Sequence, residues 1–478
     1  MSVLSKYFAF NQKTDVYPIT TNPEIGLPLL FISGNDIKIF YLDDKGKFNT
    51  EISVKKPAKY SALYLGSYIV DSNLVLTFSD KTLHALSQLT VNLSTRLPNE
   101  IVIESSSDDQ KYLASWEKND SLFVLGIFEN SNTLVVTKFF GNGNTSKHEY
   151  EINVEKMISL NSSETLFDLF DETVGKIQKI DSSIPSSLYL TSAKNKVYLI
   201  DNEIIITIDY FDDATYYLSV NLHNQLCSTT KYVYSIQEME QDVSTNSNSF
   251  IFDSAIFQLS VNKNEIGLKV QSLADANKVC YYYATGNQTI EFRNTSMKMR
   301  NEKEGFLFGD PVVREIKNTK KLLKMMLNMN PAISVFRKQS DFQILLGGVK
   351  DIYQTAGVSS KHLIASGGKM IVGPGGNLLM PDPSYIFPSN YSYSSYPSQK
   401  SASFSTIVSA STYIHNDKSI SKYTYDFIIE YANYMPGLHG LVTIFKMKGD
   451  YYLGYYSHGE HTYNLEWFKN VDDYSIQY

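Results

Sequence analysis

The sequence predicts a mainly β protein, with an irregular β-propeller-like or multi-sheet β architecture, a few helical insertions and a long Ser/Tyr-rich loop. Short apolar or alternating runs are separated by turns rich in Asn, Asp, Gly and Ser, which is the pattern of strands at hairpin spacing. These runs group into recurring units along the first 300 residues. Aromatic residues, which favour strands, are abundant, with 35 Tyr and 26 Phe against 2 Trp.

Five successive units can be outlined in the N-terminal β-rich, repeat-like region, residues 1–300. Most of them have roughly the 40 to 50 residues of a four-stranded propeller blade. They span residues 28–57, 60–95, 110–153, 186–235 and 250–292. Similar short motifs open a strand group in three of them: Ser61–Leu65, Ser187–Leu190 and Ser254–Phe257. The units are too irregular for a WD40 or kelch repeat, since no Gly-His to Trp-Asp pairing accompanies them.

A helix and a hairpin are expected in residues 301–355. Asp310 is a good N-cap, Pro311 suits the first helical position, and apolar residues recur at helical spacing as far as Asn330. Pro331 ends the helix because it cannot donate a backbone hydrogen bond. The residues expected to face the core are Val312, Ile316, Leu323 and Met326. Two strands joined by a polar turn should follow, Ala332–Arg337 and Phe342–Leu346.

A second helix is expected inside the β-rich region, over residues 162–180. Ser162 or Ser163 can cap it, and acidic residues occupy its first turns, as the helix dipole favours. Its apolar face would contain Leu166, Phe170, Val174 and Ile177. We interpret this helix as an insertion packed on the sheets, with docking of a partner as the alternative.

Residues 356–412 lose all periodicity and are rich in Gly, Pro, Ser and Tyr. Such a segment is unusual inside a compact domain, so we expect a loop or an arm, and we interpret Ser389–Ser411 as an interaction arm outside the folded core. Order returns in residues 413–478 as a C-terminal four-stranded β unit, which would complete a propeller or form a small domain. Its expected strands are Thr424–Tyr431, Leu441–Met447, Tyr451–Tyr456 and Tyr463–Phe468.

Charge and cysteine content narrow the class of protein. The net charge of -7 disfavours a protein wrapped around nucleic acid. Cys227 and Cys280 lie in apolar strand-like runs, so we expect buried thiols and no disulfide framework or cysteine metal site. No window approaches 18 apolar residues, and the N-terminus lacks a signal-peptide core. We therefore expect no membrane span, and a protein that is cytoplasmic at synthesis and then, in a virus, virion-associated.

No motif of a known reaction is complete in this sequence. His458 and His461 are three residues apart in an expected hairpin loop, whereas metalloprotease histidines stand four apart on a helix. The Gly-rich stretch near Lys369 lacks the Gly and the Ser or Thr that a phosphate loop requires. We expect no enzymatic activity and assign no catalytic, cofactor-binding or metal-binding residue. A glycosidase that draws its carboxylates from distant strands would leave no such motif.

The segment 293–338 is basic within an acidic chain, with eleven Lys or Arg against four Asp or Glu. A solvated helix face is the simplest explanation. The functional explanation is contact with a phosphate backbone or with an acidic partner surface, such as the expected helix 162–180 of a second copy. Lysines of this segment and tyrosines of the arm are our candidate partner-binding residues: Lys317, Lys320, Lys321, Lys324, Tyr391, Tyr393 and Tyr396.

Three functions from different classes follow. We expect a non-catalytic structural or adaptor component of a large assembly, of the virion or phage tail type. It would use β surfaces and the arm to contact other subunits in a homo- or hetero-oligomer. The first alternative is a carbohydrate-binding or glycoside-active β-propeller, whose loop Tyr and Asp residues would stack on and hydrogen-bond to sugars. The second is nucleic-acid contact through segment 293–338, with affinity that falls steeply with salt.

Overall fold

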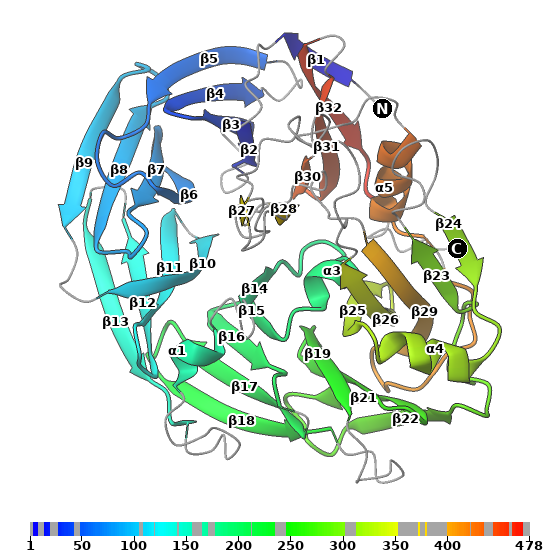
Figure 1. Cartoon of the computed structure of the whole chain (residues 1–478). Coiled ribbons are helices and arrows are strands. Elements are labelled where there is room, and N and C mark those ends of the chain that lie inside the picture. The colour runs from blue at the N-terminus through cyan, green and yellow to red at the C-terminus, as the bar shows by residue number, and fades with distance from the viewer. Residues whose placement is uncertain are drawn as a thin grey trace.

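The strands of the described residues form seven sheets of four or five strands, arranged as the blades of a propeller around a central axis (Figure 1). The computed structural model describes residues 3–7, 14–19, 27–42, 48–104, 109–118, 120–140, 143–154, 165–170, 177–211, 213–234, 245–301, 312–351, 371–372, 378–379, 399–420, 422–434, 443–457 and 461–471. The α-helices within these ranges contain 4, 4, 8 and 11 residues. Strands therefore dominate, and the expected mainly β, propeller-like fold is confirmed.

Blades 1 to 3 are four-stranded antiparallel meanders that run outward from a first strand beside the axis (Figure 1). Blade 1 consists of β2 (Thr14–Pro18), β3 (Leu27–Ser33), β4 (Asp36–Leu42) and β5 (Phe48–Lys55). Blade 2 consists of β6 (Leu63–Val70), β7 (Asn73–Ser79), β8 (Ala85–Asn92) and β9 (Pro98–Glu104). Blade 3 consists of β10 (Gln110–Lys118), β11 (Ser121–Phe128), β12 (Thr133–Phe139) and β13 (Thr145–Glu151). These blades overlap the first three expected units, but β2 lies before the unit 28–57 and β9 lies after the unit 60–95.

Blades 4 and 5 overlap the other two expected units, although their first strands begin before the units 186–235 and 250–292 do. Blade 4 has five strands: β14 (Ile177–Ile180), β15 (Asn195–Ile200), β16 (Glu203–Ile208), β17 (Ala214–Asn221) and β18 (Cys227–Val233). Blade 5 consists of β19 (Asn246–Phe252), β20 (Ala255–Val261), β21 (Glu265–Ser272) and β22 (Val279–Thr285). The motif at Ser187–Leu190 does not open a strand as expected, because Ser187 caps the short helix α3 (Leu188–Thr191).

Blade 6 has the least regular chain path. Its strand order from the rim to the axis is β24 (Val312–Glu315), β23 (Lys298–Asn301), β29 (Gln399–Ser409), β26 (Asp341–Asp351) and β25 (Asn330–Lys338). The two outer strands thus precede the inner ones in sequence. The expected hairpin is confirmed as β25 and β26. The chain between β26 and β29 contains a separate two-stranded sheet, β27 (Ile371–Val372) with β28 (Leu378–Leu379).

Blade 7 closes the ring by joining the two ends of the chain. It contains β30 (Thr443–Met447), β31 (Asp450–Ser457) and β32 (Thr462–Phe468), and the N-terminal β1 (Val3–Tyr7) pairs with β32 as its outermost strand. Three of the four strands expected in the C-terminal unit are confirmed. The expected strand Thr424–Tyr431 is wrong, because Thr424–Tyr434 is the helix α5, which buries Ile428 and Ala432 one turn apart against blade 7.

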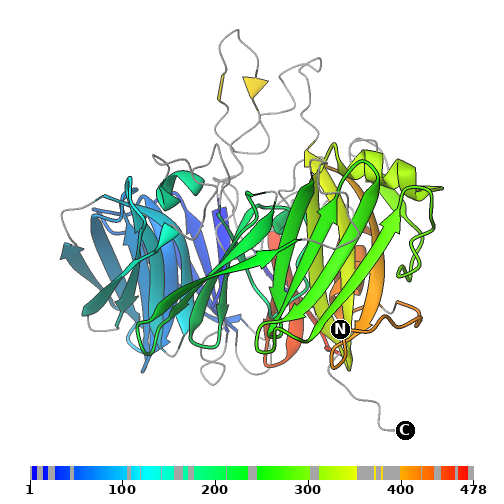
Figure 2. The same ribbon diagram turned by 90° about the horizontal axis from the view of Figure 1, so that it is seen from below.

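Asp residues with positive φ form many of the tight turns between strands. Asp71, Asp120, Asp201 and Asp253 have φ of 52°, 54°, 50° and 47°. Asp tolerates this left-handed region better than most residues because its side chain can hydrogen-bond locally. These turns let consecutive strands of a blade run up and down between the two faces of the disc (Figure 2).

Apolar side chains are buried mainly between neighbouring blades. Blades 1 and 2 share a cluster that includes Ile39 and Leu74, and blades 3 and 4 share one that includes Leu125 and Ile206. A larger cluster joins blades 4, 5 and 6 around Phe257. All five side chains are fully buried. Each blade therefore depends on both neighbours to remove its two apolar faces from water.

The helix expected over Asp310–Asn330 is shorter than predicted. Val312–Glu315 forms β24, because it pairs with β23, and the helix α4 covers only Thr319–Met326. Its N-cap is Asn318, whose side chain accepts a hydrogen bond from the backbone N of Lys321 at 2.9 Å. Asp310 and Pro311 lie outside the described residues.

The core-facing residues of this segment are mostly as expected. Ile316, Leu323 and Met326 have exposed fractions of 3%, 0% and 0%. The side chain of Val312 lies outside the described residues, while its neighbour Val313 is 56% exposed. With 8 residues against the 11 of α5, α4 is the second-longest helix in the described part of the chain, which agrees with the prediction.

The helix expected over residues 162–180 is also shorter. Only α1 (Leu166–Leu169) is helical, and its cap is Thr165, while Ile177 belongs to β14. Ser162, Ser163 and Val174 lie outside the described residues. Asp168 is engaged in the capping box of α1, through hydrogen bonds from the backbone N and Oγ1 of Thr165 at 2.7 and 2.8 Å. Its carboxylate is therefore satisfied within the chain.

The interaction arm expected over Ser389–Ser411 is wrong for residues 399–409. These residues form β29, which pairs with β26 on one side and β23 on the other. Inward and outward positions alternate along it, and Ala402, Phe404, Thr406 and Val408 are buried. The chain is core there because this period of two matches a strand. Residues 389–398, with Tyr391, Tyr393 and Tyr396, lie outside the described residues.

Both cysteines are free thiols, but the expectation that they are buried is wrong. Cys227 is exposed and Cys280 is partly exposed. They lie on β18 and β22, the outermost strands of blades 4 and 5, and such strands have no further strand to cover their edge.

A fully buried ion pair of blade 4 is linked by hydrogen bonds to blade 5. Lys196 Nζ lies 3.0 Å from Asp209 Oδ2, and neither side chain is exposed. Oδ1 accepts hydrogen bonds from Thr215 Oγ1 at 2.8 Å and Tyr234 OH at 2.7 Å, and Oδ2 accepts two from the N and Oγ of Ser249 at 2.9 Å. Burial by itself would raise the pKa of Asp209, but the charge of Lys196 and these hydrogen bonds outweigh burial and lower it. The carboxylate is saturated, so its role is structural.

Replacing Leu323 by Asp should destabilise the protein by at least about 3 kcal/mol, because the change buries a charge that has no partner. Urea unfolding followed by circular dichroism measures the effect. Lys321→Asp on the exposed face of the same helix is the matched control, and it should change the free energy of unfolding by less than about 0.5 kcal/mol. Equal stability of the two variants would contradict the packing of α4.

Candidate functional site

Blade 4 departs from the four-stranded pattern beside the axis. β14 pairs in parallel with β15, whereas the other described strand pairs of the blades are antiparallel. A parallel neighbour cannot be reached by a tight hairpin, which explains the longer connection through α3. β14 is thus an additional strand on the axial side of blade 4 (Figure 1).

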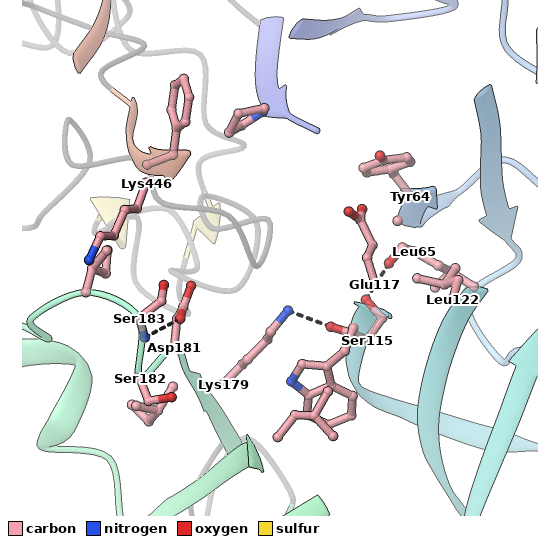
Figure 3. A pocket seen from close by; sticks show the side chains of 17 residues that line it. Tyr64, Leu65, Ser115, Glu117, Leu122, Lys179, Asp181, Ser182, Ser183 and Lys446 are labelled. Carbon is pink, nitrogen blue, oxygen red and sulfur yellow. Dashed lines mark hydrogen bonds between the residues drawn. The ribbon is translucent and has the colours of Figure 1, made fainter. Parts of the chain in front are cut away.

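A cavity of about 240 Å³ lies next to this additional strand. We call it the axial cavity. Its walls come from the first strands of blades 1, 2, 3, 4 and 7, and from the chain that follows β14. Figure 3 shows its lining, in which the principal polar side chains are Tyr64, Glu117, Lys179, Asp181 and Lys446. The cavity is therefore assembled from residues that are far apart in sequence.

Glu117, near the end of β10, is one of two acidic side chains in the cavity wall. Its Oε1 accepts hydrogen bonds from the backbone N of Ser67 at 2.9 Å and from Ser67 Oγ at 3.3 Å. Burial raises the pKa of Glu117 to about 7, although these hydrogen bonds and the charge of Lys179 oppose the shift. Glu117 as a whole residue is half-buried. Such a carboxyl can exchange a proton near neutral pH.

Lys179, on β14, is the nearby cation. Its Nζ donates a hydrogen bond to the backbone oxygen of Ser115 at 2.5 Å and lies 5.7 Å from the centre of the Trp116 ring (Figure 3). Burial lowers the pKa of Lys179, and the charges of Asp181 and Glu117 oppose that shift. An ammonium group has three hydrogens, so Nζ keeps donor capacity beyond this one hydrogen bond.

Two more residues of the cavity wall carry donor atoms that are themselves buried. Trp116 is 6% exposed, and its Nε1 has no hydrogen-bond partner among the described residues. The hydroxyl of Tyr64 likewise has no hydrogen bond of normal geometry there. Burial, with a smaller effect of Glu117, raises the pKa of Tyr64 far above its usual value, against a weaker opposing effect of Ser67. The phenol therefore stays protonated.

The lysines predicted to bind a partner lie elsewhere, on α4 and just before it. Lys317, Lys320, Lys321 and Lys324 are all exposed. We call these four side chains the α4 lysine surface. In the described part of the chain none of them forms an ion pair. Since α4 packs against β26 and β29 of blade 6, which do not line the cavity, this surface and the axial cavity are two separate candidate sites (Figure 1).

The other sequence candidates contribute little. Tyr456 OH and His461 Nδ1 lie 3.3 Å apart, while His458 and the stretch around Lys369 are outside the described residues. No cluster of three or more His, Cys, Asp or Glu suited to a metal ion occurs in the described ranges. Likewise, no helix within those ranges is long and apolar enough to cross a membrane.

Sequence reasoning missed the axial cavity. Glu117 lies in the expected unit 110–153, near the end of β10, but no functional residue was assigned in that unit. Lys179 was assigned to a helix, although it lies in β14. The available signals were two charged residues at the ends of apolar strands, and such residues are usually solvated strand ends.

Comparison with known proteins gives likeness of fold only. No family model matches the sequence, and no curated protein matches it. Among solved structures, the WD40 domain of SCAP from fission yeast matches with 11% identity and a TM-score of 0.33, over 94% of this chain and 84% of that chain. Cobalt-substituted Synechocystis ACO matches with 7% identity and a TM-score of 0.30, over 58% of this chain and 62% of that chain. This chain therefore spans about three fifths of the Synechocystis protein.

The raised pKa of Glu117 predicts a pH-dependent gain in stability for Glu117→Gln. The folded-state pKa is about 7 against an ordinary value of 4.5, so the folded protein holds the proton more tightly than the unfolded chain. Between these two values the wild type loses stability as pH rises, and above pH 7 the loss is complete. Gln cannot ionise, so the variant should exceed the wild type by about 1–3 kcal/mol at pH 8 and by little at pH 5.

Urea unfolding at both pH values measures this difference. The exposed Glu100 provides the control, because Glu100→Gln should leave stability within about 0.5 kcal/mol of the wild type at either pH. If Glu117→Gln behaves like the control, the carboxyl is hydrated and the cavity is more open than described.

Proposed function

We propose that the protein is a non-catalytic β-propeller adaptor that binds an acidic surface of another subunit through its α4 lysine surface. The observation that carries the proposal is that these four lysines are exposed and form no ion pair with a described residue. Other exposed cations of the protein do find carboxylates: Arg337 pairs with Asp253 and Lys231 with Asp213, each at 2.6 Å. The α4 lysine surface therefore keeps its charge for an external partner.

The helix that carries these lysines is firmly held, which favours binding. Leu322, Leu323 and Met326 on its other face are fully buried. Thr319 Oγ1 also donates a hydrogen bond to the backbone oxygen of Gln288 at 2.5 Å. A fixed backbone reduces the entropy that binding must overcome, so even modest charge pairing becomes effective.

An acidic protein surface suits this site better than nucleic acid does. The whole chain has a net charge of -7 and a pI near 5.7, whereas nucleic-acid-binding domains usually carry a broad basic stripe. Four lysines on and just before one short helix reach only a few phosphates. Charge on a small patch within an acidic protein is more useful for selecting and orienting a protein partner.

The setting that we propose is a large assembly of the virion or phage tail type, in which this chain contacts other subunits. That part rests on composition, chiefly the abundance of Tyr, which is enriched at protein interfaces. The extended arm no longer supports it over residues 399–409, since β29 belongs to blade 6. Sugar binding has less support at the axial cavity, because Trp116 is 6% exposed and Lys179 lies over its ring, which leaves no open face for stacking.

Charge reversal on α4 tests the proposal. The double variant Lys320→Glu with Lys324→Glu should lose binding to a polyglutamate probe in biolayer interferometry by at least about tenfold. Wild-type binding should weaken as salt rises, because the contact is electrostatic.

The matched control is Lys81→Glu with Lys263→Glu, two exposed lysines on blades 2 and 5, which changes the net charge equally and should keep wild-type binding. A short DNA duplex is measured in parallel. If the duplex binds more tightly than polyglutamate, the partner is a nucleic acid. If neither probe distinguishes the two double variants, the α4 lysine surface is simply solvated.

A further inference from the structure

We propose that the axial cavity binds a small organic monocarboxylate, which accepts hydrogen bonds from Lys179 and from the carboxyl of Glu117. This inference is independent of the adaptor function, since the α4 lysine surface contributes nothing to the cavity. It rests on three observations: an additional strand that builds the cavity, a lysine in its wall with unused donor capacity, and a carboxyl in the same wall with one oxygen not engaged by a described residue.

The size of the cavity sets the size of the ligand. Its volume of about 240 Å³ is below the roughly 300–1,000 Å³ of sites for drug-sized molecules. It is also well above the roughly 10–15 Å³ that holds one water. A molecule of a few carbon atoms with one polar end fits this range.

The lining favours an acceptor-rich ligand. Lys179 Nζ retains donor capacity beyond its hydrogen bond to Ser115. Leaving a buried donor unpaired costs about 1–3 kcal/mol, so an acceptor that reaches this ammonium group gains affinity. Because burial lowers the pKa of Lys179, an anion that enters also stabilises the charged ammonium.

Glu117 supplies the remaining hydrogen bond through its second oxygen. Ser67 occupies Oε1, and no hydrogen bond from the described residues reaches Oε2. When Glu117 is protonated, its hydroxyl can donate to a ligand carboxylate, and the two carboxyl groups then share one proton. When Glu117 is ionised, the two negative charges repel. Affinity should therefore fall as pH rises through about 7.

The other titratable groups of the cavity are consistent with a monoanion. Tyr64 on β6 stays neutral, Lys446 on β30 adds positive charge, and Asp181 after β14 adds negative charge. The backbone N of Ser183 donates to Asp181 Oδ1 at 2.7 Å (Figure 3). Two acidic groups beside the ligand disfavour a phosphate, which carries about 1.5 to 2 negative charges at neutral pH. A monocarboxylate brings one charge, which Lys179 can neutralise.

Tryptophan fluorescence can report binding, because the chain has only two Trp. Trp116 borders the cavity, while Trp467 lies on β32 and donates a hydrogen bond to Asp450 Oδ2 at 2.9 Å. In a Trp467→Phe background, Trp116 is the sole fluorophore. Acetate and lactate should change its emission saturably at pH 6, with about tenfold weaker affinity at pH 8. Calorimetry confirms the affinities, and inorganic phosphate and glucose are the comparison ligands.

Three substitutions in this background separate the roles. Lys179→Met should weaken carboxylate binding by at least about tenfold. Glu117→Gln should keep binding but remove its pH dependence, because Gln still donates a hydrogen bond and cannot ionise. Lys111→Met is the matched control: Lys111 Nζ also donates to a backbone oxygen, that of Phe170 at 2.9 Å, and lies 5.6 Å from the centre of a ring, Phe167, but outside the cavity. It should bind like the parent.

Several outcomes would overturn the proposal. These are no response to acetate or lactate at pH 6, tighter binding of phosphate or glucose than of either carboxylate, and equal losses for Lys179→Met and Lys111→Met. If circular dichroism shows that Lys179→Met is unfolded, the pH profile of Glu117→Gln decides the question. A profile that still falls through pH 7 in that variant would refute the role of Glu117 and the proposal with it.

Discussion

Closure of the ring is the constraint on which the rest of the structure depends. β1 pairs with β32 from Val3 opposite Glu466 to Tyr7 opposite Thr462, so the first strand of the described chain completes the last blade. Blades 7 and 1 can then bury their facing apolar surfaces, where the ring centres of Phe31 and Tyr463 lie 5.0 Å apart. Without closure, blades 7 and 1 would each expose an apolar face to water. The axial cavity has the same dependence, because its wall includes strands of blades 1 and 7.

Packing between blades is preserved even where a blade does not follow the regular four-stranded antiparallel pattern. Blade 4 accepts the parallel strand β14, and blade 6 takes its two outer strands from earlier in the chain. Local chemistry accommodates each departure. Gly347 lets β26 and β29 approach closely, because a Cβ there would lie 2.3 Å from the backbone oxygen of Ala402. The buried Lys196–Asp209 pair fixes blade 4 against blade 5 through the hydrogen bonds of Ser249. An additional strand in one blade can therefore change the wall of the axial cavity while the ring of blades is preserved.

The regular blades could be predicted from the sequence because their signal is local. Alternating apolar runs and Asp, Asn or Gly turns define hairpins within about ten residues, and all five expected units are blades. Blade 6 could not be predicted in this way, since β29 pairs with β23, about a hundred residues earlier. In β29 the alternation of Ser401, Ser403 and Ser405 with buried Ala402 and Phe404 was visible in the sequence, but the Ser/Tyr composition suggested an arm. The cavity residues carried even less signal, because only the closed ring brings them together.

Two carboxyl groups of this protein, Asp209 and Glu117, have pKa values shifted in opposite directions by their surroundings. At Asp209 every oxygen is occupied by donors and a lysine, so its pKa is lowered and its ionised form supports folding at neutral pH. At Glu117 the effect of burial outweighs the Ser67 hydrogen bonds and the charge of Lys179, so its pKa rises to about 7 and its ionisation at higher pH opposes folding. Lys179 carries a similar penalty, since burial lowers its pKa. The hydrogen bonds and the ion pair of Asp209 show that this fold can stabilise a buried charge. Two unfavourably placed ionisable groups in one cavity are therefore better explained by a ligand than by the needs of packing.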